Sequence, residues 1–122
     1  MSTPPLIIDT NERGPLCEAV HRMGKKEGVL VKEEFLQGMG DYKVGDSYVE
    51  CKSLSDFFQS SYSGHLWRQM DNLDANCGRI FLVVHGDIAK YIKMSQNQGR
   101  PLSYSRVTNE LMGTFARIMA DF

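Results

Sequence analysis

The chain has 122 residues, a size that suits one domain and leaves little room for two. Hydrophobic residues make up 42% and charged residues 24%, which excludes a disordered chain and a fibrous repeat. The formal net charge of -1 excludes a polybasic protein held on nucleic acid or a membrane by bulk charge, so any DNA-binding surface must be a local patch.

The sequence carries no targeting or membrane signal. No apolar run reaches the length of a membrane span, and residues 1–5 lack the pattern of a secretory signal. Cys17, Cys51 and Cys77 fit neither a disulfide framework nor a zinc motif, so we interpret them as reduced thiols, mostly in the core. We therefore expect a soluble intracellular protein without a membrane partner, nuclear in a eukaryote and cytoplasmic otherwise.

The first half of the chain alternates short strands with one helix. Its apolar run near the N-terminus predicts a buried strand, and apolar residues three and four apart then predict an amphipathic helix with Pro15 at its first position. A turn at Gly45-Asp46 predicts a hairpin. The expected elements are a strand over 5–9, a helix over 15–26, a strand region over 29–36, and hairpin strands over 42–44 and 47–52.

The second half is mostly helical. A helix begins near Ser55, is interrupted at Ser63-Gly64 and continues to about Leu73. The apolar run 79–85 predicts a strand covered on both faces, central in its sheet. Helices over 87–94 and 104–122 follow, and the last has more apolar surface than one domain face covers. This order predicts an α/β layer sandwich with a mixed sheet.

Charged side chains gather around the predicted hairpin. Residues two apart on a strand point to the same side, so Glu50 and Lys52 share one face while Cys51 faces the other. If the hairpin strands pair antiparallel, Asp41 lies at their open end near Glu50. Carboxylates suit Mg2+ or Mn2+, and a nearby lysine can orient a water that attacks a phosphodiester. The alternative is a half-exposed strand with one solvated face.

Two further acids favour the metal-site interpretation. Asp9 closes the first predicted strand, and Glu12 follows three residues later. Open α/β sheets place their ligands at strand ends of this kind. Four acids that meet in a near-neutral chain repel one another unless a cation holds them. The sequence therefore predicts a metal site built from Asp9, Glu12, Asp41 and Glu50.

The chain resembles the nuclease domain of the XPF-type (ERCC4-domain) structure-specific endonucleases in three ordered segments: IIDTNERG, LQGMGDYKVGDSYVECKSLSDFFQS and SGHLWRQMDNL. That family carries a GD...ERKxxxD signature within the PD-(D/E)xK superfamily. The resemblance runs from about Leu6 to Gly86. It implies a single restriction-endonuclease-like nuclease domain over 1–122, with a central mixed sheet of about five strands flanked by helices. The helix-hairpin-helix module that usually follows this domain in the family is not expected within these residues.

The resemblance assigns metal binding to Asp9, Glu12, Asp41 and Glu50, and the positioning of the attacking water to Lys52. Asp56 and Gln69 match later residues of the motifs and are expected to support the site, although an acid in a first helical turn is also stabilising by itself. Arg13 and Arg68 are candidates for DNA contacts. Trp67 is more simply explained by packing.

Two positions depart from the family pattern. Cys51 stands where the signature has arginine, and His65 stands where the following GRL segment has arginine. Because Cys51 is expected to face away from Glu50 and Lys52, we expect the metal site to survive and an accessory contact to be lost. Restoring arginine at position 51 is then expected to leave cleavage intact.

The resemblance implies a divalent-metal-dependent endonuclease that hydrolyses branched or flap DNA with Mg2+ or Mn2+. It also implies a homodimer or heterodimer formed through the C-terminal helix. Two alternatives stay open. The first is a non-catalytic nuclease-like subunit that binds DNA or dimerises, which is favoured by Cys51 in place of the family arginine. The second is a Holliday-junction resolvase on the same broad fold.

Overall fold

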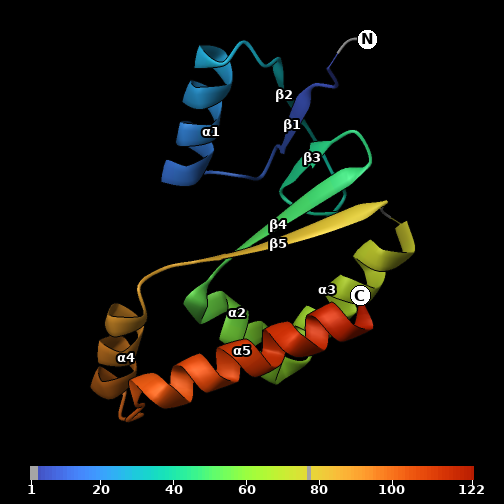
Figure 1. Cartoon of the computed structure of the whole chain (residues 1–122). Helices are drawn as coiled ribbons and strands as arrows, with labels where there is room; N and C mark the ends of the chain where they lie inside the picture. The colour runs from blue at the N-terminus through green and yellow to red at the C-terminus, as the bar shows by residue number, and fades with distance from the viewer. Residues whose placement is uncertain (1–2, 77) are drawn as a thin grey trace. The chain divides into compact units, whose positions relative to one another are not determined.

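The computed structural model describes residues 3–76 and 78–122 (Figure 1). The chain forms two compact units. The first contains the described residues up to Cys51 together with Asp71–Val83, and the second contains Lys52–Met70 and Val84–Phe122. Within the described residues, no helix is both long and apolar enough to cross a membrane.

A five-stranded mixed sheet has the strand order β2-β1-β3-β4-β5. Strand β1 pairs in parallel with β2 and antiparallel with β3, and β3 pairs antiparallel with β4. With five helices in the same chain, this sheet confirms the predicted α/β class. The strands are β1 (Leu6–Asp9), β2 (Val31–Glu34), β3 (Tyr42–Val44), β4 (Ser47–Ser53) and β5 (Arg79–His85).

Helix α1 (Pro15–Lys26) forms where the apolar spacing predicts it, with Pro15 in its first turn. Cys17, which is 7% exposed, packs with Ile8 and Tyr42 in a buried cluster of the first unit. Gly24 lies so close to Val31 that a Cβ there would be 2.6 Å from its methyl group. A small residue is therefore needed where α1 approaches β2.

Strand β5 corrects one prediction, because it is an edge strand rather than a central one. Its residues alternate between exposed and half-buried, and Phe81 and Val83 are exposed. A continuous apolar run is typical of a strand covered on both faces, but the sequence pattern cannot say what covers it. The residues of β5 alone therefore do not predict its position in the sheet.

The second unit is helical, and its helices are shown in Figure 1. Ser53 caps α2 by accepting a hydrogen bond from the N–H of Asp56, and Gly64 ends α2 in a left-handed conformation. Asp87 caps α4 in the same way through Lys90, and α4 contacts both α2 and α5. The helices of this unit are α2 (Leu54–Ser63), α4 (Ile88–Asn97) and α5 (Tyr104–Asp121), and the unit also contains the first half of α3 (His65–Asn76).

Phe57 is the centre of this helical unit and carries a stability prediction. Its side chain is fully buried and its ring contacts those of Phe58 and Phe115 at centroid distances of 5.7 and 5.4 Å. Phe57→Ala should lower the free energy of unfolding by about 3–5 kcal/mol, because it leaves a cavity and removes ring contacts. Phe81→Ala, at a half-exposed site, is the control and should lower the free energy of unfolding much less in urea denaturation. Equal decreases for the two variants would contradict the assignment of Phe57 to the core.

Candidate active site

Asp9 is fixed at the end of β1 by backbone groups. Its N–H donates to the carbonyl of Asp41 at 2.9 Å. Its carboxylate accepts the N–H of Leu36 at 2.9 Å and that of Asn11 at 3.3 Å, and the residue is only 9% exposed. A buried carboxylate that accepts two N–H bonds has little freedom to turn. Asp9 is therefore held on the strand end where the sequence placed it.

Asp41 enters β3 next to β4 at the open end of the hairpin. Its N–H donates to the carbonyl of Val49 at 2.8 Å, and its Oδ2 accepts the N–H of Cys51 at 2.7 Å. Because Tyr42 is paired with Val49, the next pair in this antiparallel register is Asp41 and Glu50. The hairpin therefore places Asp41 near Glu50, as the sequence predicted.

The glycine before Asp41 has a steric reason. Gly40 has a φ of 94°, a conformation that residues with a Cβ rarely adopt, and a Cβ there would be 3.1 Å from the carbonyl oxygen of Val49. The backbone thus needs glycine to bring Asp41 against β4. The Gly-Asp pair is consequently explained by local geometry as well as by chemistry.

Glu12 and Asp41 form a pair of interacting carboxyl groups. The Glu12 side chain is hydrogen bonded to that of Asp41, and the Tyr42 hydroxyl donates to Glu12 Oε2 at 3.4 Å. Burial and then the negative charge of Asp41 raise the pKa of Glu12 from 4.5 to about 7, with a smaller contribution from Asp9. Three acids from the predicted set therefore interact in one place, and one of them holds a proton near neutrality.

This pair predicts how stability without metal depends on pH. Between pH 4.5 and about 7, folded Glu12 keeps a proton that the unfolded chain has released, so the free energy of unfolding should fall as the pH rises through this window. Glu12→Gln should remove that part of the slope in urea denaturation measured at pH 4.5 to 7.5 with chelator present. Exposed Glu18 offers the matched control Glu18→Gln, which should keep the wild-type slope. A wild-type slope in Glu12→Gln would refute the assignment.

The donor chemistry of this pair fits a hard divalent cation. Crowded carboxylates whose mutual repulsion raises a pKa are stabilised by a cation that takes the place of the proton. Within residues 3–76 and 78–122, no three His, Cys, Asp or Glu side chains are grouped so as to hold a metal ion. Mg2+ commonly uses one or two carboxylates and keeps several waters, so a pair such as Glu12 and Asp41 is compatible with such an ion.

Strand β4 carries the other predicted groups. Lys52 is only 8% exposed, and it stands two residues from Glu50 on the same strand. Cys51 packs against the cluster of Ile8, Cys17 and Tyr42. Burial, and then the charges of nearby carboxylates, raise the pKa of the Cys51 thiol to about 11, so it stays protonated at neutral pH.

The cysteine prediction is confirmed for the two described residues. Cys17 and Cys51 are free thiols, the first buried and the second half-buried. Cys77 lies outside the described residues.

The residues expected to support the site belong to the second unit. Asp56 is exposed in the first turn of α2, where its N–H binds the Ser53 cap, so the helix itself accounts for an acid there. Gln69 on α3 has a buried Oε1, the one buried side-chain polar atom in the described part of the chain without a hydrogen-bond partner. A buried amide oxygen without a protein partner is costly, so its partner must come from outside the described side chains.

The candidate DNA-contacting residues have different surroundings. Arg13 is exposed, and one of its terminal nitrogens donates to the carbonyls of Thr10 and Glu12, both at 2.6 Å. Arg68 is exposed on α3. The Arg117 guanidinium lies over the Trp67 ring at 4.0 Å, so this half-buried ring has a partner within the chain, in agreement with a packing role.

Two contributors were missed by sequence reasoning. The Tyr42 hydroxyl reaches Glu12 across thirty positions of sequence, and the Leu36 N–H binds Asp9 across twenty-seven. Tyr42 directly follows Asp41, so its place in the motif was visible, but the contact of its hydroxyl with Glu12 exists only in the folded chain, where burial raises the pKa of the hydroxyl. Nothing in the sequence marks the backbone group of Leu36.

A mixed sheet whose neighbouring strand ends bring acids together defines an α/β domain with a candidate acidic site. The chain belongs to the ERCC4 domain family, whose model matches residues 8–122. Among curated proteins, no sequence matches this chain.

Two solved structures are similar to the chain. XPF from Aeropyrum pernix has 29% sequence identity and a TM-score of 0.71, and the match covers 98% of this chain and 50% of that one. XPF from Aeropyrum pernix in complex with DNA has 24% identity and a TM-score of 0.58 over 97% of this chain and 66% of that one. These matches confirm the resemblance to XPF-type proteins, and this chain spans about half the length of the first.

Proposed function

We propose that residues 1–122 act as one nuclease domain that hydrolyses phosphodiester bonds of branched or flap DNA with Mg2+ or Mn2+. The observation that carries this proposal is the interacting pair Glu12–Asp41, in which burial and the charge of Asp41 raise the pKa of Glu12, as at a place where a cation is favoured. Membership of the ERCC4 family supports the reaction type. The similar XPF structure with DNA supports the substrate class.

The proposed mechanism divides the work among named side chains. Glu12 and Asp41 would hold the metal, Asp9 would help to fix Asp41 through its backbone N–H, and Asp9 and Glu50 would add negative charge. When bound, the metal polarises the phosphoryl oxygen and lowers the pKa of a bound water. Lys52 holds the attacking water and offsets the charge that develops on phosphorus. Loss of the Glu12 proton, with a pKa near 7, precedes metal binding, so affinity for metal rises as the pH passes 7.

Cleavage of a labelled 3′-flap duplex tests this function. The chain incubated with Mg2+ or Mn2+ should produce a cut near the branch point, and chelator should abolish it. Matched single-stranded and blunt duplex substrates of the same length should be cut much less. Equal cutting of all substrates would contradict structure specificity, and the absence of any cut with either metal would contradict the nuclease proposal.

A second candidate function is a non-catalytic subunit that binds DNA beside an active partner. Cys51 in place of the family arginine favours it, as does the lack of a three-ligand group within the described residues. We rank it second because all four predicted acids are present. This candidate predicts flap binding with no cleavage in either metal.

The dimer proposal rests on α5, which exposes large apolar side chains. Met112 is 58% exposed and Met119 is 81% exposed. A second copy or a related subunit that covers this helix would remove apolar surface from water. If the chain forms a homodimer, light scattering during gel filtration should give twice the mass of the chain. Met119→Glu should reduce the measured mass to that of the monomer. If the partner is a related subunit, the mixture should give the summed mass of both chains.

A further inference from the structure

A pocket of about 680 Å³ lies between α2 and α4 in the second unit. Its walls combine aromatic rings with hydrogen-bonding side chains and one cation. The residues that matter here are Phe58, Gln59, Tyr62, Tyr91, Gln98 and Arg100. A pocket with flat apolar walls and a few polar groups suits a planar, polar ligand.

The aromatic wall is a column of three nearly parallel rings. Phe58 is stacked on Tyr91 with centroids 5.3 Å apart and planes at 27°, and on Tyr62 with centroids 6.2 Å apart and planes at 21°. Phe58 is buried, whereas Tyr62 is 68% exposed and Tyr91 is half-buried. The two tyrosines thus present ring surface to the pocket, and nucleobases stack on such surface with little sequence preference.

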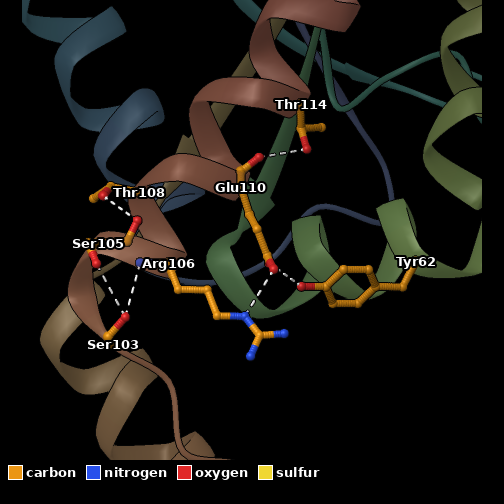
Figure 2. A network of polar contacts seen from close by, with 7 residues as sticks. All are labelled: Tyr62, Ser103, Ser105, Arg106, Thr108, Glu110 and Thr114. Carbon is orange, nitrogen blue, oxygen red and sulfur yellow. Dashed lines mark hydrogen bonds and ion pairs between the residues drawn. The ribbon is translucent and has the colours of Figure 1, made fainter.

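Tyr62 is held in place before any ligand arrives. Its hydroxyl donates to Glu110 Oε2 at 2.5 Å, and Arg106 Nε donates to the other oxygen of the same carboxylate at 3.3 Å (Figure 2). Glu110 is thereby paired with a cation outside the pocket. A ring that is already oriented loses little conformational entropy when a base stacks on it.

Among the described residues that line this pocket, Arg100 is the only charged one. The chain turns back at Gly99, whose φ is 76°, and the Arg100 N–H donates to the carbonyl of buried Ser95 at 2.8 Å. The N–H groups of Gln98 and Gly99 bind further carbonyls at the end of α4. The C-terminal end of a helix is the negative end of its dipole, and here its carbonyls are satisfied by these N–H groups. The Arg100 guanidinium is therefore the group at this end that can pair with an anion.

A second hollow of about 200 Å³ adjoins the first and shares Ser55, Tyr91 and Met94 with it. Lys90 lies on its wall, and the neighbouring Asp87 carboxylate is bound to the Lys90 N–H as the cap of α4. Lys90 lies in the first turn of α4 and Arg100 lies in the turn that follows the helix, so the two cations stand toward opposite ends of α4. Two cations thus bracket an aromatic wall along one groove.

We propose that this groove binds a short unpaired segment of DNA, with bases stacked on Tyr62 and Tyr91 and phosphates paired with Lys90 and Arg100. A positive groove lined with aromatic rings is how proteins hold single strands without reading their sequence. This inference rests on the proposed function, because branched and flap substrates carry unpaired strand beside duplex. It gives the helical unit the task of selecting that strand.

Fluorescence anisotropy with a labelled oligothymidine, in chelator, tests the groove without any cleavage. Tyr91→Ala should weaken binding about fivefold or more, since stacking contributes at least that factor per base. Tyr91→Phe keeps the ring and should bind like wild type. Arg100→Gln should weaken binding and reduce its salt dependence. Lys93→Gln removes the same charge from an exposed site on α4 outside both hollows and should have little effect.

The outcomes separate this inference from the proposed function. Weaker oligothymidine binding by Tyr91→Ala and Arg100→Gln, with Tyr91→Phe and Lys93→Gln unchanged, supports the groove even if no flap is cut. If Tyr91→Ala and Arg100→Gln fold and bind oligothymidine as tightly as wild type, the groove proposal is wrong, and that result leaves the proposed nuclease function untouched. If Lys93→Gln and Arg100→Gln weaken binding equally, the effect comes from the net charge of the protein and not from the groove, and the groove proposal is also wrong.

Discussion

Asp41→Asn should lower the rate of flap cleavage by roughly 100-fold or more, because a bound metal supplies several kcal/mol of transition-state stabilisation. Asparagine has the same shape and can still accept the Cys51 N–H that Asp41 accepts at 2.7 Å. The fold should therefore be kept while the charge that attracts the metal is lost. Cleavage under single-turnover conditions measures the effect directly.

The hairpin offers a matched control for this substitution. Asp46 is exposed in the turn at the opposite end of the same two strands, and Asp46→Asn changes the net charge equally. It should cut at the wild-type rate. Equal activity in Asp41→Asn and Asp46→Asn would assign the cleavage to a contaminant or to a site elsewhere.

Lys52→Met should reduce cleavage by about 100-fold while metal binding is retained. Methionine is similar in length to the lysine side chain, which is only 8% exposed, and urea denaturation of the variant checks that the fold is kept. The lost ammonium is the group that we propose holds the attacking water, and positioned proton-transfer groups contribute at least this factor. Cleavage rate and calorimetric Mn2+ affinity, measured on the same preparation, check both halves of the prediction.

Lys43→Met is the control for the second substitution. Lys43 lies on the neighbouring strand β3, with its amine 5.2 Å from the centre of the Tyr48 ring. Its loss should leave cleavage within about twofold, because it has no part in the proposed chemistry. If Lys52→Met cuts like wild type, or if it loses metal affinity as Asp41→Asn does, the water-positioning role is wrong.

Local signals made most of the elements predictable. Proline at the start of α1 and the Gly45-Asp46 turn gave the bounds of α1 and β3 correctly, because both depend on backbone preferences within a few residues. The strand region 29–36 was too long, since only Val31–Glu34 pairs with β1. The place of β5 at the sheet edge depends on long-range pairing, which no short window contains.

The candidate site was partly predictable for the same reason. The Gly-Asp pair and the strand spacing of Glu50 and Lys52 are local patterns, and the hairpin register brings Asp41 opposite Glu50 as expected. The hydrogen bond between Glu12 and Asp41 joins two loops, so only the folded chain could reveal it. The raised pKa of Glu12 follows from that contact and from burial, and neither is encoded in the residue type.

Calorimetric titration of Mn2+ at pH 7.5 tests the central claim most directly, since that claim is that Glu12 and Asp41 hold a divalent ion. Wild-type protein and Asp46→Asn should bind one ion per chain. Titrations nearer pH 7, in buffers of different ionisation enthalpy, should show that Mn2+ binding releases a proton from Glu12. Asp41→Asn and Glu12→Gln should each lose most of that affinity. Identical binding by all four proteins, or no binding by the wild type, would contradict the account.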